Sequence, residues 1–161
     1  MLVFFMRSGI GDSGQGVDFG VQRIVDQSSS SESLGKFIAV LPLENMSPDP
    51  KHAYFADGVH ENILTNLALD ENVEVISRST MMAYRNTKER FSTIAEKLGA
   101  RYLVEGSVRR SGDQVRITLQ LLDAENGHHI WAENYSRSLD WLAETEAEVA
   151  REIARQIANR I

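Results

Sequence analysis

The sequence predicts an α/β domain in which a mixed five-stranded sheet packs with three main helices, in the order β-α-β-α-β-β-β-α. The apolar run 37–41 stops at a proline, as expected for a strand that is buried on both faces. Two segments with helical spacing of apolar residues follow it. Three alternating segments joined by short turns then indicate an antiparallel meander, and a long helix ends the chain.

Residues 1–36 differ in composition from the rest of the chain. Glycine recurs between residues 9 and 20, and residues 28–31 are an uninterrupted serine run. Such a segment loses much backbone entropy on ordering and offers little apolar surface in return. We therefore expect residues 1–36 to form a flexible leader or linker, and residues 37–161 to form the α/β domain.

The first helix is expected where apolar residues recur at helical spacing from Val59 onward, with Asp57 as its N-cap. The second strand, 73–76, alternates and contains β-branched residues. A polar stretch leads to the second helix, which we expect Ser92 or Thr93 to cap, with Glu96 completing a capping box after Thr93. This helix should end at Gly99, since glycine is the usual residue at that position.

The meander is expected to contain strands 102–109, 115–121 and 129–135. Its first turn is Ser111–Asp113, and its second is Ala124–Gly127, where Asn-Gly suits positive φ. The last helix should begin near Asp140. Its first turns are acidic and its last turns are basic, which suits the helix dipole.

Composition excludes several classes of function. The chain has 161 residues, no cysteine and a formal net charge of −6. A disulfide, a thiolate zinc site and a thiol nucleophile are therefore excluded. Nucleic acid is not an expected partner, because phosphate binding requires clustered basic residues. No glycine loop for phosphates and no Gly-x-Ser-x-Gly turn is present. We predict no catalytic residue, no metal and no cofactor.

Targeting signals are also absent from the sequence as given. The apolar start, residues 1–6, is shorter than the core of a signal peptide and far shorter than the roughly 20 residues of a membrane-spanning helix. We expect no membrane insertion by this chain. We expect a cytoplasmic location, with the periplasm as the alternative.

Two histidine-containing groups have partial metal-ligand spacing. Asp57, His60 and Glu61 lie on one side of a helical turn, and we interpret them as a capping aspartate with two solvated neighbours. His128 and His129 are adjacent in a strand, so their side chains should point to opposite faces and not share one ion.

Charged residues recur across the predicted meander. They predict cross-strand ion pairs, and a binding face for an acidic partner is the alternative. The residues are Glu105, Arg109, Arg116 and Glu133. A second patch contains Met81, Met82 and Tyr84 between Arg78 and Arg85, and it suits either a contact surface or, for the methionines, the core.

Three segments carry a resemblance to a known family: 39–58, 98–127 and 129–135, with the Leu-Gly-x-Arg-Tyr-x-x-Glu-Gly-Ser-Val-Arg pattern in the second. From residue 37 to 161 the chain resembles the TolB-like N-terminal domain of bacterial class III adenylate cyclases, CadC-type transcriptional regulators and tetratricopeptide-repeat proteins. TolB and CsgG are more distant relatives. His60 departs from the family pattern, which usually has Ser or Thr there. The resemblance implies an accessory domain without catalytic activity.

The expected binding site follows the first strand, because open α/β sheets bind ligands beyond the carboxyl ends of their strands. The loop 44–50 contains two prolines that restrict it. The candidate binding residues are Glu44, Asn45, Ser47, Asp57, Gly58 and Arg78. We expect a non-enzymatic protein-interaction or signal-sensing module, whose partner is a protein or a neighbouring domain; a small ligand is also compatible. The alternatives are an adenylate cyclase fragment and a cell-envelope interaction protein. The oligomeric state stays open.

Overall fold

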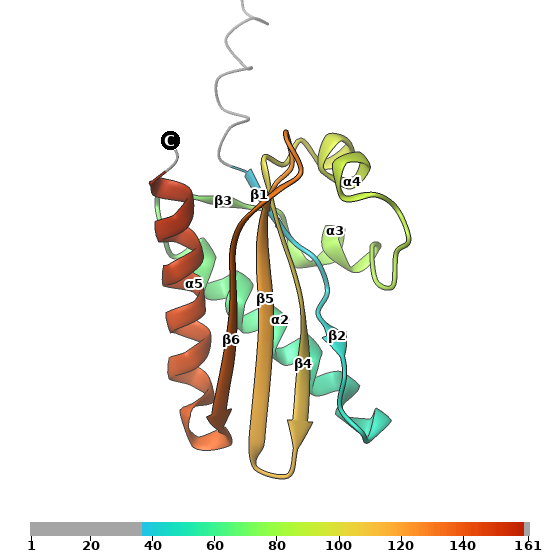
Figure 1. Ribbon diagram of the computed structural model, residues 1–161, viewed down its shortest axis with the longest axis vertical. Helices are drawn as coiled ribbons and strands as arrows, with labels where there is room; N and C mark the ends of the chain where they lie inside the picture. The colour runs from blue at the N-terminus through green and yellow to red at the C-terminus, as the bar shows by residue number, and fades with distance from the viewer. Residues whose placement is uncertain (1–36, 160–161) are drawn as a thin grey trace, which may run out of the picture. The chain divides into compact units, whose positions relative to one another are not determined.

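A computed structural model describes residues 37–159 (Figure 1). It confirms the predicted fold class: a mixed sheet with three main helices, ending in a meander and a long helix. The strands are β1 Phe37–Val40, β2 Glu44–Asn45, β3 Glu74–Val75, β4 Tyr102–Ser111, β5 Gln114–Asp123 and β6 His128–Ser138. The helices are η3 Pro50–His52, α2 Ala53–Ala68, α3 Arg78–Met82, α4 Phe91–Leu98, η4 Leu139–Trp141 and α5 Leu142–Ala158. The predicted flexible leader, residues 1–36, lies outside the described residues.

The sheet has six strands, one more than predicted, because part of the first loop is itself a strand. The order is β3-β1-β4-β5-β6, with β3, β1 and β4 parallel and β4, β5 and β6 antiparallel. β1 ends just before Pro42, whereas β4 continues to Ser111. Since proline has no amide hydrogen, it interrupts the pairing. The chain then resumes parallel pairing with the later part of β4 as β2, with Glu44 opposite Ser107.

The meander forms as predicted, and both of its turns contain a glycine in the left-handed region. Gly112 has φ of 60° and Gly127 has φ of 70°. Because only glycine adopts this region without a steric penalty, these two residues fix the short connections. Ten consecutive residue pairs join β4 to β5, from Tyr102–Asp123 to Ser111–Gln114.

The two faces of the sheet are covered differently. Figure 1 shows α2 crossing behind β4 and β5, with α5 beside β6. The main core lies between these helices and the sheet, and it includes Ile63, Leu119 and Ile153, all fully buried. On the other face, α3 and α4 cover only β1 and the start of β4 around Met81 and Leu103. The rest of that face of the meander is not covered by a helix of the described residues.

The start of α2 corrects the sequence prediction. The helix begins at Ala53 and not near Val59, so Asp57 lies inside it and is not an N-cap. The start is earlier because Asp49 accepts a hydrogen bond from the Lys51 amide at 2.9 Å and starts the short helix η3, which leads directly into α2. Proline at the first position of η3 favours this arrangement.

The region before the meander contains a second correction. Helix α3 was not predicted; Ser77 caps it by accepting a hydrogen bond from the Thr80 amide at 3.4 Å. Helix α4 begins at Phe91, so the predicted cap at Ser92 or Thr93 and its capping box are wrong. The predicted end is confirmed, because Gly99 has φ of 64°. Within residues 37–159, no helix has both the length and the apolarity that a membrane span requires.

Candidate functional site: a cleft at the carboxyl end of β1

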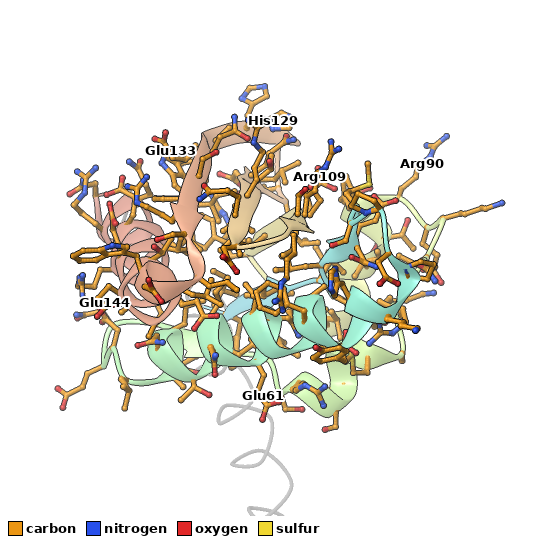
Figure 2. The ribbon with its side chains drawn as sticks, turned by 90° about the horizontal axis from the view of Figure 1, so that it is seen from below. Glu61, Arg90, Arg109, His129, Glu133 and Glu144 are labelled. Atoms are coloured by element: carbon orange, nitrogen blue, oxygen red, sulfur yellow. The ribbon has the colours of Figure 1, made fainter. Side chains whose placement is uncertain are left out.

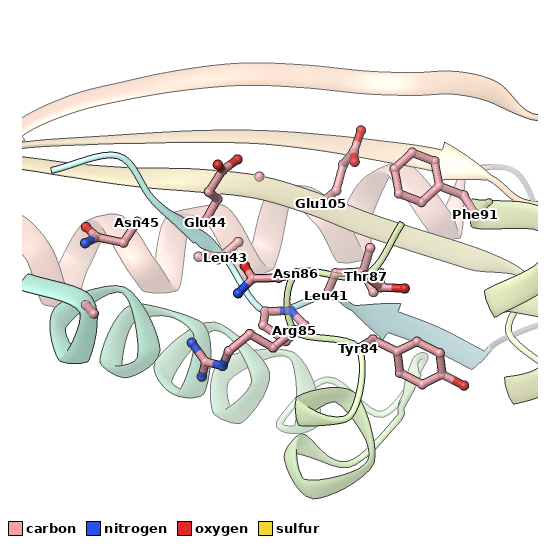
Figure 3. Close-up of a pocket in the computed structure, with 13 residues that line it drawn as sticks. Leu41, Leu43, Glu44, Asn45, Tyr84, Arg85, Asn86, Thr87, Phe91 and Glu105 are labelled. Carbon is pink, nitrogen blue, oxygen red and sulfur yellow. The ribbon is translucent and has the colours of Figure 1, made fainter. Parts of the chain in front are cut away.

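An open cleft of about 600 Å³ lies where β1 ends and the chain crosses to β2 (Figure 3). Three segments form its walls: residues 41–45, the loop 84–87 after α3 with Phe91, and Glu105 and Gly106 of β4. Its position is the one where open α/β sheets bind ligands, beyond the carboxyl end of a central parallel strand. The sequence predicted a site after this strand, and the structure places a cleft there.

The first wall is held against β4 by backbone and side-chain hydrogen bonds. The Met46 amide donates to the Val108 carbonyl at 2.8 Å, which extends the pairing of β2. The Ser47 hydroxyl accepts from the Arg110 amide at 2.9 Å. Asn45 closes a local turn, because its Oδ1 accepts from the Ser47 amide at 3.1 Å. Asn45 and Ser47 therefore fix the shape of the loop.

The second wall is the loop after α3, and it is fixed equally well. The Thr87 amide donates to the Tyr84 carbonyl at 3.1 Å, and Asn86 between them has φ of 56°. Asparagine is one of the few residues that tolerate this left-handed conformation. Arg85 donates to the Asp57 carboxylate at 2.8 Å, which ties this loop to α2.

Charge is unevenly distributed in the cleft. Figure 3 shows the carboxylates of Glu44 and Glu105 on the same side of the cleft, with Arg85 on the opposite side. Burial raises the pKa of Glu105 above its ordinary value, although His129 acts in the opposite direction. The cleft therefore combines a half-buried carboxyl group with a guanidinium and with the aromatic residues Tyr84 and Phe91.

His60 completes the hydrogen bonding of β1 beside the cleft. The Ile38 carbonyl accepts from the Ile76 amide, and the Val40 carbonyl points to the same edge, where β3 has ended. His60 Nε2 lies 2.8 Å from this carbonyl and donates to it, while Nδ1 is buried without a partner. Desolvation lowers the pKa of His60, so the ring is neutral near pH 7. The expectation of a solvated His60 is therefore wrong, because its side chain is fully buried.

The predicted site residues separate into three groups. Glu44 and Asn45 line the cleft, and Asp57 contacts it through Arg85. Ser47 faces β4, as described above. Gly58, also a candidate binding residue, lies inside α2 and does not line the cleft.

Arg78 is the remaining predicted residue, and it does not line the cleft. Its Nε lies 3.7 Å from a carboxylate oxygen of Glu61, in an exposed ion pair. Asp57, His60 and Glu61 thus have three different partners and do not converge.

Several lining residues had no signal in the sequence. They are Asn86, Thr87 and Phe91, whereas Glu105 was noted only as a charged residue of the meander. Tyr84 and Arg85 were noted only as part of a patch around Met81 and Met82. Met81 is fully buried against Ala39 and Leu103, which settles its role as a core residue.

The other charged and histidine residues were also placed. Within residues 37–159, no three His, Cys, Asp or Glu residues gather as a metal site would require. His128 and His129 are both exposed. The predicted cross-strand ion pairs among Glu105, Arg109, Arg116 and Glu133 are wrong for this part of the chain, because the register places Arg109 opposite Arg116.

Similarity to solved structures is one of fold. The chain superposes on TolB from Acinetobacter baumannii with a TM-score of 0.58 and 16% identity, covering 77% of this chain and 28% of TolB. For lipoprotein GNA1162 from Neisseria meningitidis the TM-score is 0.55 at 18% identity, covering 73% and 96%. For the LpoB C-terminal domain from Salmonella enterica it is 0.50 at 18% identity, covering 76% and 99%.

Sequence similarity is more specific. Over 114 residues the chain is 43% identical to "Putative adenylate cyclase 3" of Rhizobium meliloti (strain 1021). This match covers 71% of the chain but only 19% of the relative. The predicted resemblance to the TolB-like domains of cyclases and regulators is confirmed. Residues 34–154 match the family described as HilA/YgeH-like transcriptional regulator, second domain, and the chain belongs to that family.

Proposed function

We propose that this chain is a non-catalytic accessory domain that contacts a neighbouring domain of a multidomain protein through the cleft at the carboxyl end of β1. One observation carries the proposal. Both walls of the cleft are fixed by their own contacts, β2 to β4 on one side and Arg85 to Asp57 on the other. A surface that is ordered before binding loses little entropy when a partner docks.

The composition of the cleft supports a protein contact. Tyr84, Phe91 and Arg85 belong to the residue types that are enriched at the centre of protein interfaces. Glu44 and Glu105 add charge that can orient a partner. A volume of about 600 Å³ also suits a small molecule, so a low-molecular-weight ligand is the alternative occupant.

The family and the Rhizobium relative support an accessory role. The family is defined as the second domain of a larger regulator. The relative extends far beyond the segment that this chain matches, since the match covers 19% of it. The remainder of such a protein is therefore a defined candidate partner.

An NMR titration tests the proposal. The isotope-labelled chain is titrated with the Rhizobium relative from which the matched 114 residues have been removed. We expect shifts at Glu44, Asn45, Glu105 and the loop 84–87. Glu105→Gln should weaken binding, whereas Glu96→Gln, an exposed control on α4, should not. Absence of shifts, or shifts confined to α2 and α5, would contradict the proposal.

Adenylate cyclase activity is the second candidate, because the relative carries that name. We infer that the activity resides outside the matched segment. The cleft is lined by no aspartate, whereas a class III cyclase holds two metals through paired aspartates. The purified chain with ATP and Mg²⁺ or Mn²⁺ should form no cyclic AMP. A product that is lost in the Glu44→Gln/Glu105→Gln variant would replace our proposal.

Location remains a proposal as well. A family of transcriptional regulators favours the cytoplasm. A cell-envelope interaction protein in the periplasm is the alternative, and cell fractionation with an antibody against the chain distinguishes the two.

A further inference from the structure

Two arginines lie side by side on the uncovered face of the meander. The register of β4 and β5 places Arg109 directly opposite Arg116, and both side chains are exposed. Figure 2 shows Arg109 on the side of the sheet away from α2. Like charges at directly opposite positions destabilise a sheet. We call these two residues the arginine pair.

No carboxylate neutralises the arginine pair within the described residues. Within residues 37–159, Arg116 donates from its Nε to the Ser136 hydroxyl at 3.3 Å, and the Arg109 side chain forms no hydrogen bond or ion pair. Four other arginines of the described residues do form ion pairs with carboxylates: Arg78, Arg85, Arg101 and Arg155. The arginine pair therefore keeps its donors available.

Arg110, the neighbour of Arg109, shows the contrast within one strand. Its Nε donates to the Gly112 carbonyl at 3.2 Å, and its guanidinium lies 5.2 Å from the centre of the Phe55 ring. Arg110 is thus engaged on the other face of the sheet. Of these two neighbours on β4, Arg110 is the one whose side chain has a partner within residues 37–159.

The cavity at the arginine pair has no acidic side chain in its lining. A shallow cavity of about 380 Å³ is lined by Arg109, Ser111, Gln114, Val115, Arg116 and Ser136. Two carboxylates outside this cavity belong to the same face: Glu44 of β2, which lies opposite Ser107, two residues from Arg109, and Glu105, four residues from Arg109 along β4. Within residues 37–159, neither carboxylate forms an ion pair with Arg109 or Arg116.

A second cavity in the domain has a different charge balance. It lies between β6 and α5 and is lined by Glu133, Glu148 and Glu152 together with Arg137, Arg151 and Arg155. There each basic group has acidic groups nearby. Only the cavity at the arginine pair, among the cavities described here, presents guanidinium groups with no carboxylate.

We propose that Arg109 and Arg116 bind an oxyanion, a carboxylate or phosphate group, that a partner protein carries. Guanidinium groups bind both anions through two parallel hydrogen bonds. The hydroxyls of Ser111 and Ser136 and the amide of Gln114 add neutral donors. The ligand relieves the repulsion between the arginines, which explains why a like-charge pair is tolerated here. Nucleic acid is disfavoured by the net charge of −6.

Titration with three probes tests this site. The probes are a glutamate-rich peptide, the same peptide with phosphoserine in place of its central glutamates, and inorganic phosphate. We expect at least one peptide to bind and to shift the Nε–Hε signals of Arg109 and Arg116. The Arg109→Gln/Arg116→Gln variant should weaken that binding at least tenfold. Arg90→Gln, which removes an exposed arginine outside the cavity, should change it less than twofold.

Two further measurements keep the outcomes distinct. The melting temperature of the double variant without ligand should equal or exceed that of the wild type, which shows that the fold is retained. Glu105→Gln should leave peptide binding unchanged, so failure of the cleft proposal and failure of this one are separable. The proposal is overturned by equal affinity in the double variant, by equal weakening in Arg90→Gln, by binding of phosphate without either peptide, or by tighter binding of duplex DNA.

Discussion

Glu146 should make the stability of the domain depend on pH in an unusual direction. This residue lies on α5, is 3% exposed and accepts one hydrogen bond, from the Asn62 side chain of α2 at 2.9 Å. Its other carboxylate oxygen is buried without a partner. Burial raises the pKa of Glu146 from 4.5 to about 7, while the bond from Asn62 lowers it by a smaller amount.

The sign follows from the protons that each state binds. Between pH 4.5 and about 7 the folded state keeps a proton on Glu146 that the unfolded state has released. The free energy of unfolding therefore falls as the pH rises through this window. A difference between 4.5 and about 7 corresponds to about 3 kcal/mol. Most surface carboxylates that form ion pairs contribute with the opposite sign.

Glu146→Gln isolates this contribution, because glutamine has the same shape and does not titrate. We expect the variant to be more stable than the wild type by about 1–3 kcal/mol at pH 8 and equally stable, within about 1 kcal/mol, at pH 4.5. Urea unfolding followed by tryptophan fluorescence measures both, since Trp131 and Trp141 lie in the folded domain.

His60 must be separated from this effect. Desolvation lowers its pKa, so the unfolded state binds the proton more readily and stability rises with pH below about 6.5. The raw curve of the wild type therefore combines two opposing slopes. Because the variant retains His60, the difference between the two curves reports Glu146 alone. If that difference is constant from pH 4.5 to 8, the carboxyl group titrates normally and our reasoning is refuted.

Three further predictions concern stability and need one thermal or urea melt each. Gly106→Ala should destabilise the domain by more than about 2 kcal/mol, because a Cβ would lie 2.1 Å from the Thr118 carbonyl oxygen; Gly58→Ala is the control, since a Cβ there meets nothing within 4 Å and should stabilise α2 by about 0.5–1 kcal/mol. His60→Ala should cost about 2–4 kcal/mol, because it leaves the Val40 carbonyl unpaired and opens a cavity; a loss below about 1 kcal/mol would mean that water replaces the ring. Asp57→Asn should cost less than about 1 kcal/mol, since its ion pair with Arg85 is partly exposed; a larger loss would show that this pair holds the second wall in place.

The fold was predictable because its signals are local and repeated. The run 37–41, the alternation in the meander and the apolar spacing of the helices each specify an element independently of the rest. The helix starts were predicted less well. Asp57 looked like a cap, but the chain was already helical from Ala53, because Asp49 and Pro50 start η3. A weak local signal upstream decided the boundary.

The site was predicted in part, for a physical reason. Loop 44–50 was identifiable because it follows a buried strand, and Glu44 and Asn45 do line the cleft. The second wall could not be identified from the sequence, since Asn86 and Thr87 are separated from β1 by α2 and β3 in the chain. Only tertiary packing brings them to the cleft. His60 was misjudged because the sequence does not show that β3 ends before it reaches the Val40 carbonyl. The His60 side chain binds this carbonyl in place of a β3 amide.

The mismatch in length between β1 and β4 connects both proposed sites. β1 stops before Pro42, whereas β4 continues to Ser111. The stop opens the cleft, because the chain leaves the sheet opposite Glu105 and Gly106 before β2 resumes the pairing. Because β4 continues beyond the end of β1, Arg109 lies outside the part of the sheet that α3 and α4 cover. Lengthening β1 would therefore close the cleft and leave the arginine pair intact, so evolution could alter the two contacts separately.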